Sequence, residues 1–153
     1  MDVTQEETDR RMMGVALDEA RRAVMEDEIP IGAVVTGPDG RIIGRGHNLT
    51  ETLNDVTAHA EMQAITAAAN TLGGKYLQDC TLYVTMEPCL MCAGAIAWAQ
   101  VSRIVIGAAD PKRGYSTIVR PEVPTFHPRA TVTYGVLADE ATRLMKEFFS
   151  TRR

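Results

Sequence analysis

The sequence predicts an α/β fold of three layers, an α/β/α sandwich in which helices cover both faces of a mixed central sheet of about five strands. The first observation behind this prediction is the order of the hydrophobic patterns, which alternate between helical and strand spacing along most of the chain. The second is size, because 153 residues with 45% hydrophobic and 24% charged side chains suit one core. We therefore expect residues 1–153 to form a single domain with a mostly parallel sheet.

An amphipathic helix is predicted over residues 5–27. Met13 and Leu17 recur there at helical spacing, and Arg and Glu side chains occupy the other face. Thr4 or Thr8 is suitably placed to cap the start of this helix, since threonine hydroxyls accept hydrogen bonds from free backbone N–H groups.

A hairpin is predicted next. Two short apolar runs, 31–36 and 41–46, flank the turn signal Gly37-Pro38-Asp39-Gly40. The remaining predicted elements are, in order, a helix over 58–72, a strand over 81–85, a helix over 89–100, a strand over 103–107, a loop over 110–129, a strand over 131–134 and a helix over 137–149.

The helix over 89–100 is apolar on nearly all sides, so neighbours must cover it on several sides. A chain of this size is short of such cover, and we therefore expect a homodimer. The nearly apolar run 89–99 is too short for a membrane span, which needs about 20 residues. With an acidic N-terminus and only three cysteines, the sequence predicts a cytoplasmic protein with reduced thiols and no membrane partner.

The charge distribution is uneven. The chain has a net charge of −4, which argues against a general nucleic-acid binder, and DNA is not expected as a partner. Residues 103–153, however, hold 9 basic and 5 acidic side chains. This basic third is either a solvated surface or a patch that meets phosphate groups.

Two short motifs indicate a metal site. His59-Ala60-Glu61 opens one predicted helix and Pro88-Cys89-Leu90-Met91-Cys92 opens another. Cys89 and Cys92 lie three residues apart on one helical turn, so both thiolates can bind one zinc ion, with His59 as a third ligand. Three protein ligands leave the fourth tetrahedral position for water, as in catalytic zinc sites. Glu61 is a poor ligand at that spacing, but it can reach back and take a proton from the bound water.

Each motif alone has other readings. A Cys-x-x-Cys pair at a helix start also suits a thiol–disulfide oxidoreductase or half of a structural zinc site. A structural site would need a fourth ligand, and Cys80, His47 and His127 do not have suitable spacing. Cys80 is expected to be a small buried side chain. The joint pattern favours catalytic zinc.

These motifs resemble those of the zinc-dependent nucleobase deaminases, the cytidine and deoxycytidylate deaminase superfamily, and within it the bacterial tRNA-specific adenosine deaminases. The resemblance extends over about residues 10–151. It is carried by Glu28-Ile29-Pro30-Ile31-Gly32-Ala33-Val34, Gly46-His47-Asn48, Thr57-Ala58-His59-Ala60-Glu61, Leu82-Tyr83-Val84-Thr85-Met86-Glu87-Pro88-Cys89, Met91-Cys92-Ala93-Gly94-Ala95, Gly135-Val136-Leu137-Ala138-Asp139-Glu140 and Phe148-Phe149.

The resemblance implies a cytidine deaminase-like fold and hydrolytic deamination of adenosine to inosine at the wobble position of a tRNA anticodon. It implies one zinc per subunit on His59, Cys89 and Cys92, a zinc-bound hydroxide that attacks C6, and Glu61 as the proton shuttle. The tRNA anticodon stem-loop would be the partner. The substrate contacts it implies are Asn48, Ile31 and Ala60 at the base and Asp110, Lys112, His127 and Phe149 at neighbouring nucleotides.

Other functions remain open at this point. A deaminase of a free base or nucleoside, of the guanine or cytosine type, would share every catalytic residue. A silent zinc-binding module would have no use for Glu61. The segment 116–121 departs from the pattern usual in the tRNA enzymes and is shorter, and Val56 stands where proline is usual. Both departures concern the choice of substrate rather than the zinc chemistry.

Overall fold

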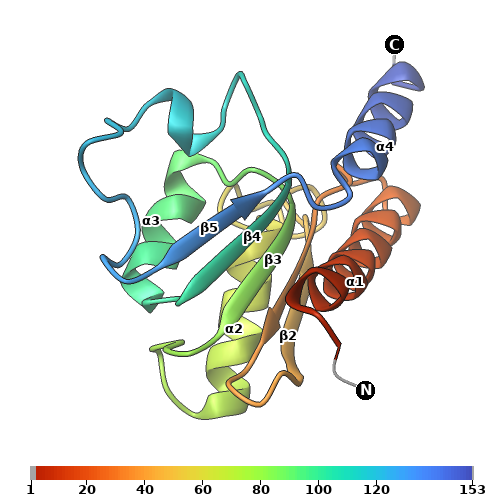
Figure 1. Cartoon of the computed structure of the whole chain (residues 1–153). Coiled ribbons are helices and arrows are strands. Elements are labelled where there is room, and N and C mark those ends of the chain that lie inside the picture. Colours follow the sequence, from red (N-terminus) through yellow and green to blue (C-terminus); the bar gives the residue numbers. More distant parts are fainter. Residues whose placement is uncertain (1–2, 153) are drawn as a thin grey trace.

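The computed structural model describes residues 3–152 (Figure 1). The elements are α1 (Gln5–Met25), β1 (Gly32–Thr36), β2 (Ile42–His47), α2 (Ala60–Leu72), β3 (Thr81–Met86), α3 (Leu90–Ala99), β4 (Arg103–Ala108), a short 3₁₀ helix (Tyr115–Thr117), β5 (Thr131–Tyr134) and α4 (Ala138–Ser150). Each predicted helix and strand is present, with bounds that differ by at most two residues.

The five strands form one mixed sheet in the order β2-β1-β3-β4-β5. β1 pairs antiparallel with both β2 and β3, whereas β3, β4 and β5 are parallel to one another. The mixed sheet is confirmed, and four of its five strands, β2, β3, β4 and β5, run in the same direction. Only β1, which lies between β2 and β3, runs the other way, so two of the four pairings are antiparallel.

Helices cover both faces of the sheet, α1 and α4 on one side and α2 and α3 on the other (Figure 1). The strands divide their side chains accordingly, because successive residues of a strand point to opposite faces. Val34, Tyr83 and Val105 pack under α1 with Met12, Met13 and Ala16. The alternate positions, including Ala33, Leu82, Val84, Ile104 and Ile106, pack with Ala64, Ala93 and Ile96 of α2 and α3. This gives the predicted three layers.

The two ends of α1 have identifiable caps. Thr4 Oγ1 accepts a hydrogen bond from Glu7 N at 3.1 Å, so Thr4 rather than Thr8 is the N-cap. The helix ends at Met25, two residues before the predicted end, because Asp27 takes a left-handed conformation with φ 63°. The N–H groups of Asp27 and Glu28 then bond back to Val24 O and Ala23 O, at 3.1 and 2.8 Å. This closing pattern turns the chain toward β1.

Gly46 allows the hairpin to approach α2 closely. A Cβ at this position would lie 2.6 Å from Ala60 O and 2.7 Å from Ala64 N, both backbone atoms of α2. Any side chain at residue 46 would therefore push the first turn of α2 away from β2. The glycine thus helps to fix where the start of α2 lies.

Metal-ligand candidates lie at one end of the sheet. β2 and β3 run in the same direction, so the chain that follows each strand emerges at the same edge. The segment after β2 leads to His59, the N-cap of α2, and the segment after β3 leads to Cys89, the N-cap of α3. The topology therefore brings two helix N-termini together. No helix within residues 3–152 has the length and apolarity needed to cross a membrane.

Candidate active site

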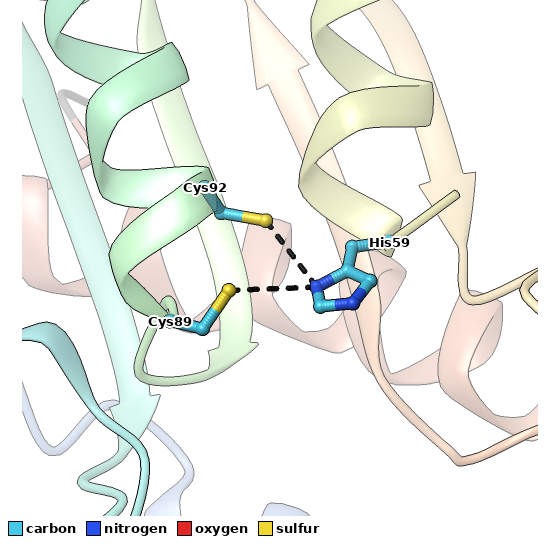
Figure 2. Close-up of side chains that lie close together, drawn as sticks. All are labelled: His59, Cys89 and Cys92. Atoms are coloured by element: carbon cyan, nitrogen blue, oxygen red, sulfur yellow. Dashed lines mark hydrogen bonds between the residues drawn. The ribbon is translucent and has the colours of Figure 1, made fainter. Parts of the chain in front are cut away.

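His59, Cys89 and Cys92 lie together between the starts of α2 and α3 (Figure 2). His59 Nδ1 is 3.6 Å from Cys89 Sγ and 3.4 Å from Cys92 Sγ. Neither N-cap side chain, His59 or Cys89, caps its own helix. Both turn toward the cluster instead, and Cys92 joins them from the first turn of α3, as its spacing from Cys89 predicts.

The separations in the cluster fit a tetrahedral zinc ion. Bonds of about 2.3 Å to sulfur and 2.0–2.1 Å to nitrogen at tetrahedral angles separate a nitrogen from a sulfur ligand by about 3.5 Å. The two N–S separations lie on either side of this value, and all three ligand atoms lie within 4.8 Å of one another. A Cys₂His donor set is also one that zinc prefers. The three side chains could therefore hold zinc and leave a fourth position for water.

The electrostatics of the cluster favour thiolate. Hydrogen bonds from Cys92 and from His59 lower the pKa of Cys89 to about 4. The hydrogen bond that Cys92 donates to Cys89, together with burial, raises the pKa of the Cys92 thiol. Cys89 is therefore the thiol that ionises more readily, and the positive ends of the two helix dipoles stabilise its thiolate.

Glu61 lies beside the cluster but outside the set of ligand atoms. Its side chain is buried, with only 4% exposed. Burial raises the pKa of Glu61 to about 7. A carboxyl group with a pKa near neutrality is suited to both accepting and donating a proton. This position agrees with the predicted role of a proton carrier rather than a ligand.

A family comparison favours the zinc deaminases over the thiol–disulfide oxidoreductases. Residues 6–108, more than half of the chain, match the family model of the cytidine and deoxycytidylate deaminase zinc-binding region. The chain belongs to this deaminase family. The matched region contains His59, Glu61, Cys89 and Cys92.

Relatives of this deaminase include enzymes named for tRNA. It is 46% identical over 143 residues to the tRNA-specific adenosine deaminase of Agrobacterium fabrum, covering 92% of this chain and 93% of the relative. It is also 46% identical to a protein of Deinococcus deserti named tRNA(Ile)-lysidine synthase, where the match covers 92% of this chain. This chain spans only 27% of the length of that relative and 24% of a second of the same name, from Deinococcus radiodurans.

Solved structures share the fold of this deaminase. A structure described as a tRNA:A34 deaminase, in a study of A-to-I editing at the wobble position, is 44% identical with a TM-score of 0.79. The similarity covers 88% of this chain and 98% of that one. A guanine deaminase from Nitrosomonas europaea is 28% identical with a TM-score of 0.77, over 98% of this chain and 87% of that one. These neighbours confirm the cytidine deaminase-like fold.

Three predicted contacts of the base lie at the edge of the sheet from which the chain leads to His59. Asn48 follows β2 and Ile31 precedes β1, and Asn48 N donates a hydrogen bond to Ile31 O at 3.2 Å. Asn48 is 5% exposed, Ile31 is partly buried and packs against the core, and Ala60 is buried in the first turn of α2. The structure therefore brings Ile31 and Asn48 into direct contact and places Ala60 between His59 and Glu61.

The loop after β4 also reaches the cluster end of the sheet. Asp110 Oδ1 accepts hydrogen bonds from Lys112 N and Arg113 N, at 3.0 Å each, so Asp110 shapes a tight turn. Tyr115 N donates to Pro88 O at 2.9 Å, which ties the loop to the segment before Cys89. Lys112 is exposed on this turn.

His127 and Phe149 are not brought to the metal cluster in the same way. His127 lines a surface hollow with residues one or two positions before β3, β4 and β5, namely Asp79, Ser102 and Ala130. The amino ends of these parallel strands lie at the edge opposite Cys89. Phe149 is 49% exposed on α4 and packs edge-on against Phe148, at 5.3 Å between ring centres. Phe148 lines a second hollow with Thr50, Glu51 and Thr52, which follow Asn48.

Two buried carboxylates near the site have no role that the sequence motifs predict. Glu28 is fully buried and Glu87 is 5% exposed, and both accept hydrogen bonds from loops beside the cluster. The only local signal is a charged residue placed shortly before a proline. That signal does not reveal the partners, because the partners are 20 to 29 residues away in the sequence.

Proposed function

We propose that this protein is a hydrolytic deaminase that converts adenosine to inosine at the wobble position of a tRNA anticodon. The observation that carries this proposal is the buried Glu61 beside three side chains with the spacing of a tetrahedral zinc site. The relatives named tRNA-specific adenosine deaminase support the choice of substrate, since they match this chain along nearly their full lengths.

The chemistry divides between His59, Cys89 and Cys92, which hold the metal, and Glu61, which moves protons. A zinc ion held by these three side chains would supply Lewis acidity, which lowers the pKa of a bound water molecule toward neutrality. Glu61 accepts a proton from the attacking water and delivers it to the ring nitrogen beside C6. The water oxygen meanwhile bonds to C6. Glu61 then takes the remaining proton of that oxygen and donates it to the departing amine, so that the C6–N bond breaks, ammonia leaves and a carbonyl remains at C6.

Substrate binding is assigned to residues around this end of the sheet. Asn48 would hydrogen-bond the base, and Ile31 and Ala60 would line its pocket. A base at an anticodon tip is already single-stranded, so extruding it costs less than flipping a base from a duplex. Asp110 and Lys112 would meet neighbouring nucleotides. Phe149 on α4 is a further candidate contact, and His127 at the opposite edge of the sheet would reach only a more distant nucleotide.

A homodimer is part of the proposal. The supporting observation is the outer face of α3, where Leu90 is 48% and Trp98 is 84% exposed. Gly94 lies between them and is also exposed. These three residues are spaced four apart and share one helical face. A second copy of the chain would cover this apolar stripe. The homodimer would then bind tRNA in the cytoplasm.

Deamination of a free base is the second candidate. The guanine deaminase from Nitrosomonas europaea supports it, because that enzyme matches 98% of this chain at a TM-score of 0.77. The excess of basic side chains in residues 103–153 favours the tRNA substrate, since a free base offers no phosphate groups. Phosphate contacts also make binding of an RNA substrate weaken with added salt.

Single-turnover inosine formation tests the proposal. The zinc-loaded protein is mixed with an anticodon stem-loop that carries a wobble adenosine, and in parallel with adenine, guanine, cytosine and cytidine. We expect conversion of the stem-loop alone, at a rate that falls as salt is added. Conversion of a free base alone would overturn the assignment of tRNA as the substrate, but it would leave the proposed role of Glu61 in proton transfer unchanged.

A further inference from the structure

Glu28 is a buried carboxylate at the centre of a hydrogen-bond network. Its Oε1 accepts hydrogen bonds from Asn48 Nδ2 at 3.2 Å and Glu51 N at 3.1 Å. Its Oε2 accepts from Thr52 N and Thr52 Oγ1, each at 2.6 Å. Burial alone would raise the pKa of Glu28, but the donors on Thr52 and Glu51 outweigh it and hold the pKa below its usual range. Glu28 is therefore an anion that the loop after β2 surrounds.

The position of Glu28 is set by the end of α1. Its backbone N–H bonds to Ala23 O at 2.8 Å, and Asp27 before it is left-handed. This pattern fixes the backbone of the residues that directly follow the helix. The carboxylate is thus built on a rigid element, and the loop 48–52 folds around it.

Glu28 also orients the amide of Asn48. Asn48 Nδ2 donates to Glu28 Oε1 and to Thr50 Oγ1, the latter at 3.3 Å. An ionised carboxylate only accepts hydrogen bonds, so the nitrogen and not the oxygen of the amide must face Glu28. Rotating the amide by 180° would set its oxygen against the carboxylate oxygen, which is unfavourable in a buried site. One rotamer of Asn48 is therefore selected before any substrate binds.

We propose that Glu28 is a positioning residue that fixes the orientation of the Asn48 amide, and so determines which edge of the base Asn48 can bind. This inference rests on the proposed function, in which Asn48 contacts the base. Glu28 does not touch the substrate or the metal ligands itself. Its effect passes through Asn48 and the loop 48–52.

Glu87 provides a matched comparison. It is also buried, and its carboxylate accepts from Asp110 N at 3.0 Å, Ser116 N at 3.0 Å and Ser116 Oγ at 2.6 Å. It thus holds the other loop beside the cluster, 110–116, in the way that Glu28 holds 48–52. None of these bonds involves Asn48. Glu87→Gln therefore makes the same chemical change in a similar environment without acting on Asn48.

A double-mutant cycle on kcat/KM for the stem-loop tests the proposal in the zinc-loaded protein. Glu28→Gln should lower kcat/KM about 30-fold in the wild-type background, because a glutamine at 28 can also donate and no longer selects one amide rotamer. In an Asn48→Ala background the same change should cost less than about threefold. Glu87→Gln should lower kcat/KM by the same factor in both backgrounds. Equal losses from Glu28→Gln in both backgrounds would overturn the proposal.

A readout that does not depend on activity separates this proposal from the proposed function. We expect the Asn48 side-chain NH₂ to give two resolved, exchange-protected proton signals by NMR in the wild type and in Glu87→Gln. Both signals should lose protection in Glu28→Gln, or in Glu28→Asp if the glutamine variant does not fold. Unprotected Asn48 signals in the wild type would contradict the positioning role. A wild-type protein with protected signals but no stem-loop conversion would contradict the substrate assignment alone.

Discussion

Arg103 at the start of β4 binds Asp9 of α1 through two hydrogen bonds of 2.6 Å, from Nη1 to Oδ1 and from Nη2 to Oδ2. Asp9 is 4% exposed and also accepts from Gln5 Nε2 at 3.0 Å and Tyr83 Oη at 3.2 Å. The pair joins two segments 94 residues apart and holds the first helix on the sheet. Burial opposes ionisation of Asp9, but Arg103, with Gln5 and Tyr83, outweighs it and keeps the pKa of Asp9 below its usual range.

The Asp9–Arg103 pair predicts a loss of stability in acid. The folded-state pKa of Asp9 is lower than its unfolded value of about 3.9, so the pair contributes fully above that pH and its contribution disappears as pH falls through the folded-state pKa. The stability difference between the wild type and Asp9→Asn should therefore be largest near pH 7 and shrink below about pH 4. Urea unfolding at a series of pH values measures it. A difference that grows toward low pH would contradict this assignment.

Replacing Arg103, the cationic member of the Asp9–Arg103 pair, is a second test of its contribution to stability. Arg103→Leu leaves the Asp9 carboxylate buried without its partner, which should cost about 3 kcal/mol of unfolding free energy at pH 7. Urea unfolding gives the value. Arg21→Leu, which removes an exposed pair with Asp18, is the control and should change stability by less than about 0.5 kcal/mol. Equal effects of the two changes would mean that the buried pair contributes no more than the surface one.

Gly46 should be intolerant of a side chain. In Gly46→Ala the new Cβ would meet backbone atoms of Ala60 and Ala64, and the first turn of α2 would have to move with His59. We expect a loss of about 1–3 kcal/mol and weaker zinc binding. Gly14→Ala is the control, because a Cβ there has no neighbour within 4 Å, and in a helix the change should stabilise by about 0.5–1 kcal/mol. Thermal unfolding and zinc titration of both variants give the comparison.

The three cysteines should differ in their effect on metal content. Cys89→Ala or Cys92→Ala removes a thiolate from the cluster, and the purified protein should then hold less than about 0.1 zinc per chain. Cys80→Ala makes the same change at a buried cysteine outside the cluster, and zinc should stay at one per chain. Elemental analysis of the three proteins decides this. Full zinc in Cys89→Ala would exclude the proposed ligand set.

The exposed face of α3 predicts the effect of a charge on assembly. Trp98→Glu places a carboxylate in the apolar stripe, so the homodimer should dissociate to monomers at micromolar concentration. Tyr76→Glu alters a half-exposed aromatic residue outside α3 and should leave the mass unchanged. Sedimentation equilibrium measures both masses. A wild-type monomer, or a dimeric Trp98→Glu, would show that this face is not the interface.

The sequence predicts the metal cluster because the ligands occur in short motifs whose spacing can be read directly from the sequence. Cys89 and Cys92 share one helical turn, and His59 and Cys89 each follow a segment that leaves the same edge of the sheet. The long-range pairs could not be predicted in this way. The bond between Glu28 and Asn48 depends on how the end of α1 packs against the loop after β2. The hydrophobic pattern of neither segment predicts that the end of α1 and the loop after β2 come into contact.

The position of His127 shows the same limit inside a loop. Residues 110–129 are one connection in the sequence, and the resemblance to the tRNA enzymes implies that both Asp110 and His127 contact the substrate. In the structure the loop crosses the length of the sheet, since it leaves the carboxyl end of β4 and enters the amino end of β5. Asp110 is therefore at the cluster edge and His127 at the opposite edge. Distance along a connection that joins parallel strands does not translate into distance from a site.

The central claim is that His59, Cys89 and Cys92 hold the metal while Glu61 moves the protons. Glu61→Gln removes the titratable group and keeps the shape of the side chain, so zinc content and inosine formation measured on one sample test this division directly. We expect one zinc per chain and a rate of inosine formation lower by at least about 10³-fold. Full zinc with a near-normal rate would contradict the role of Glu61, and loss of zinc would mean that Glu61 belongs to the ligand set.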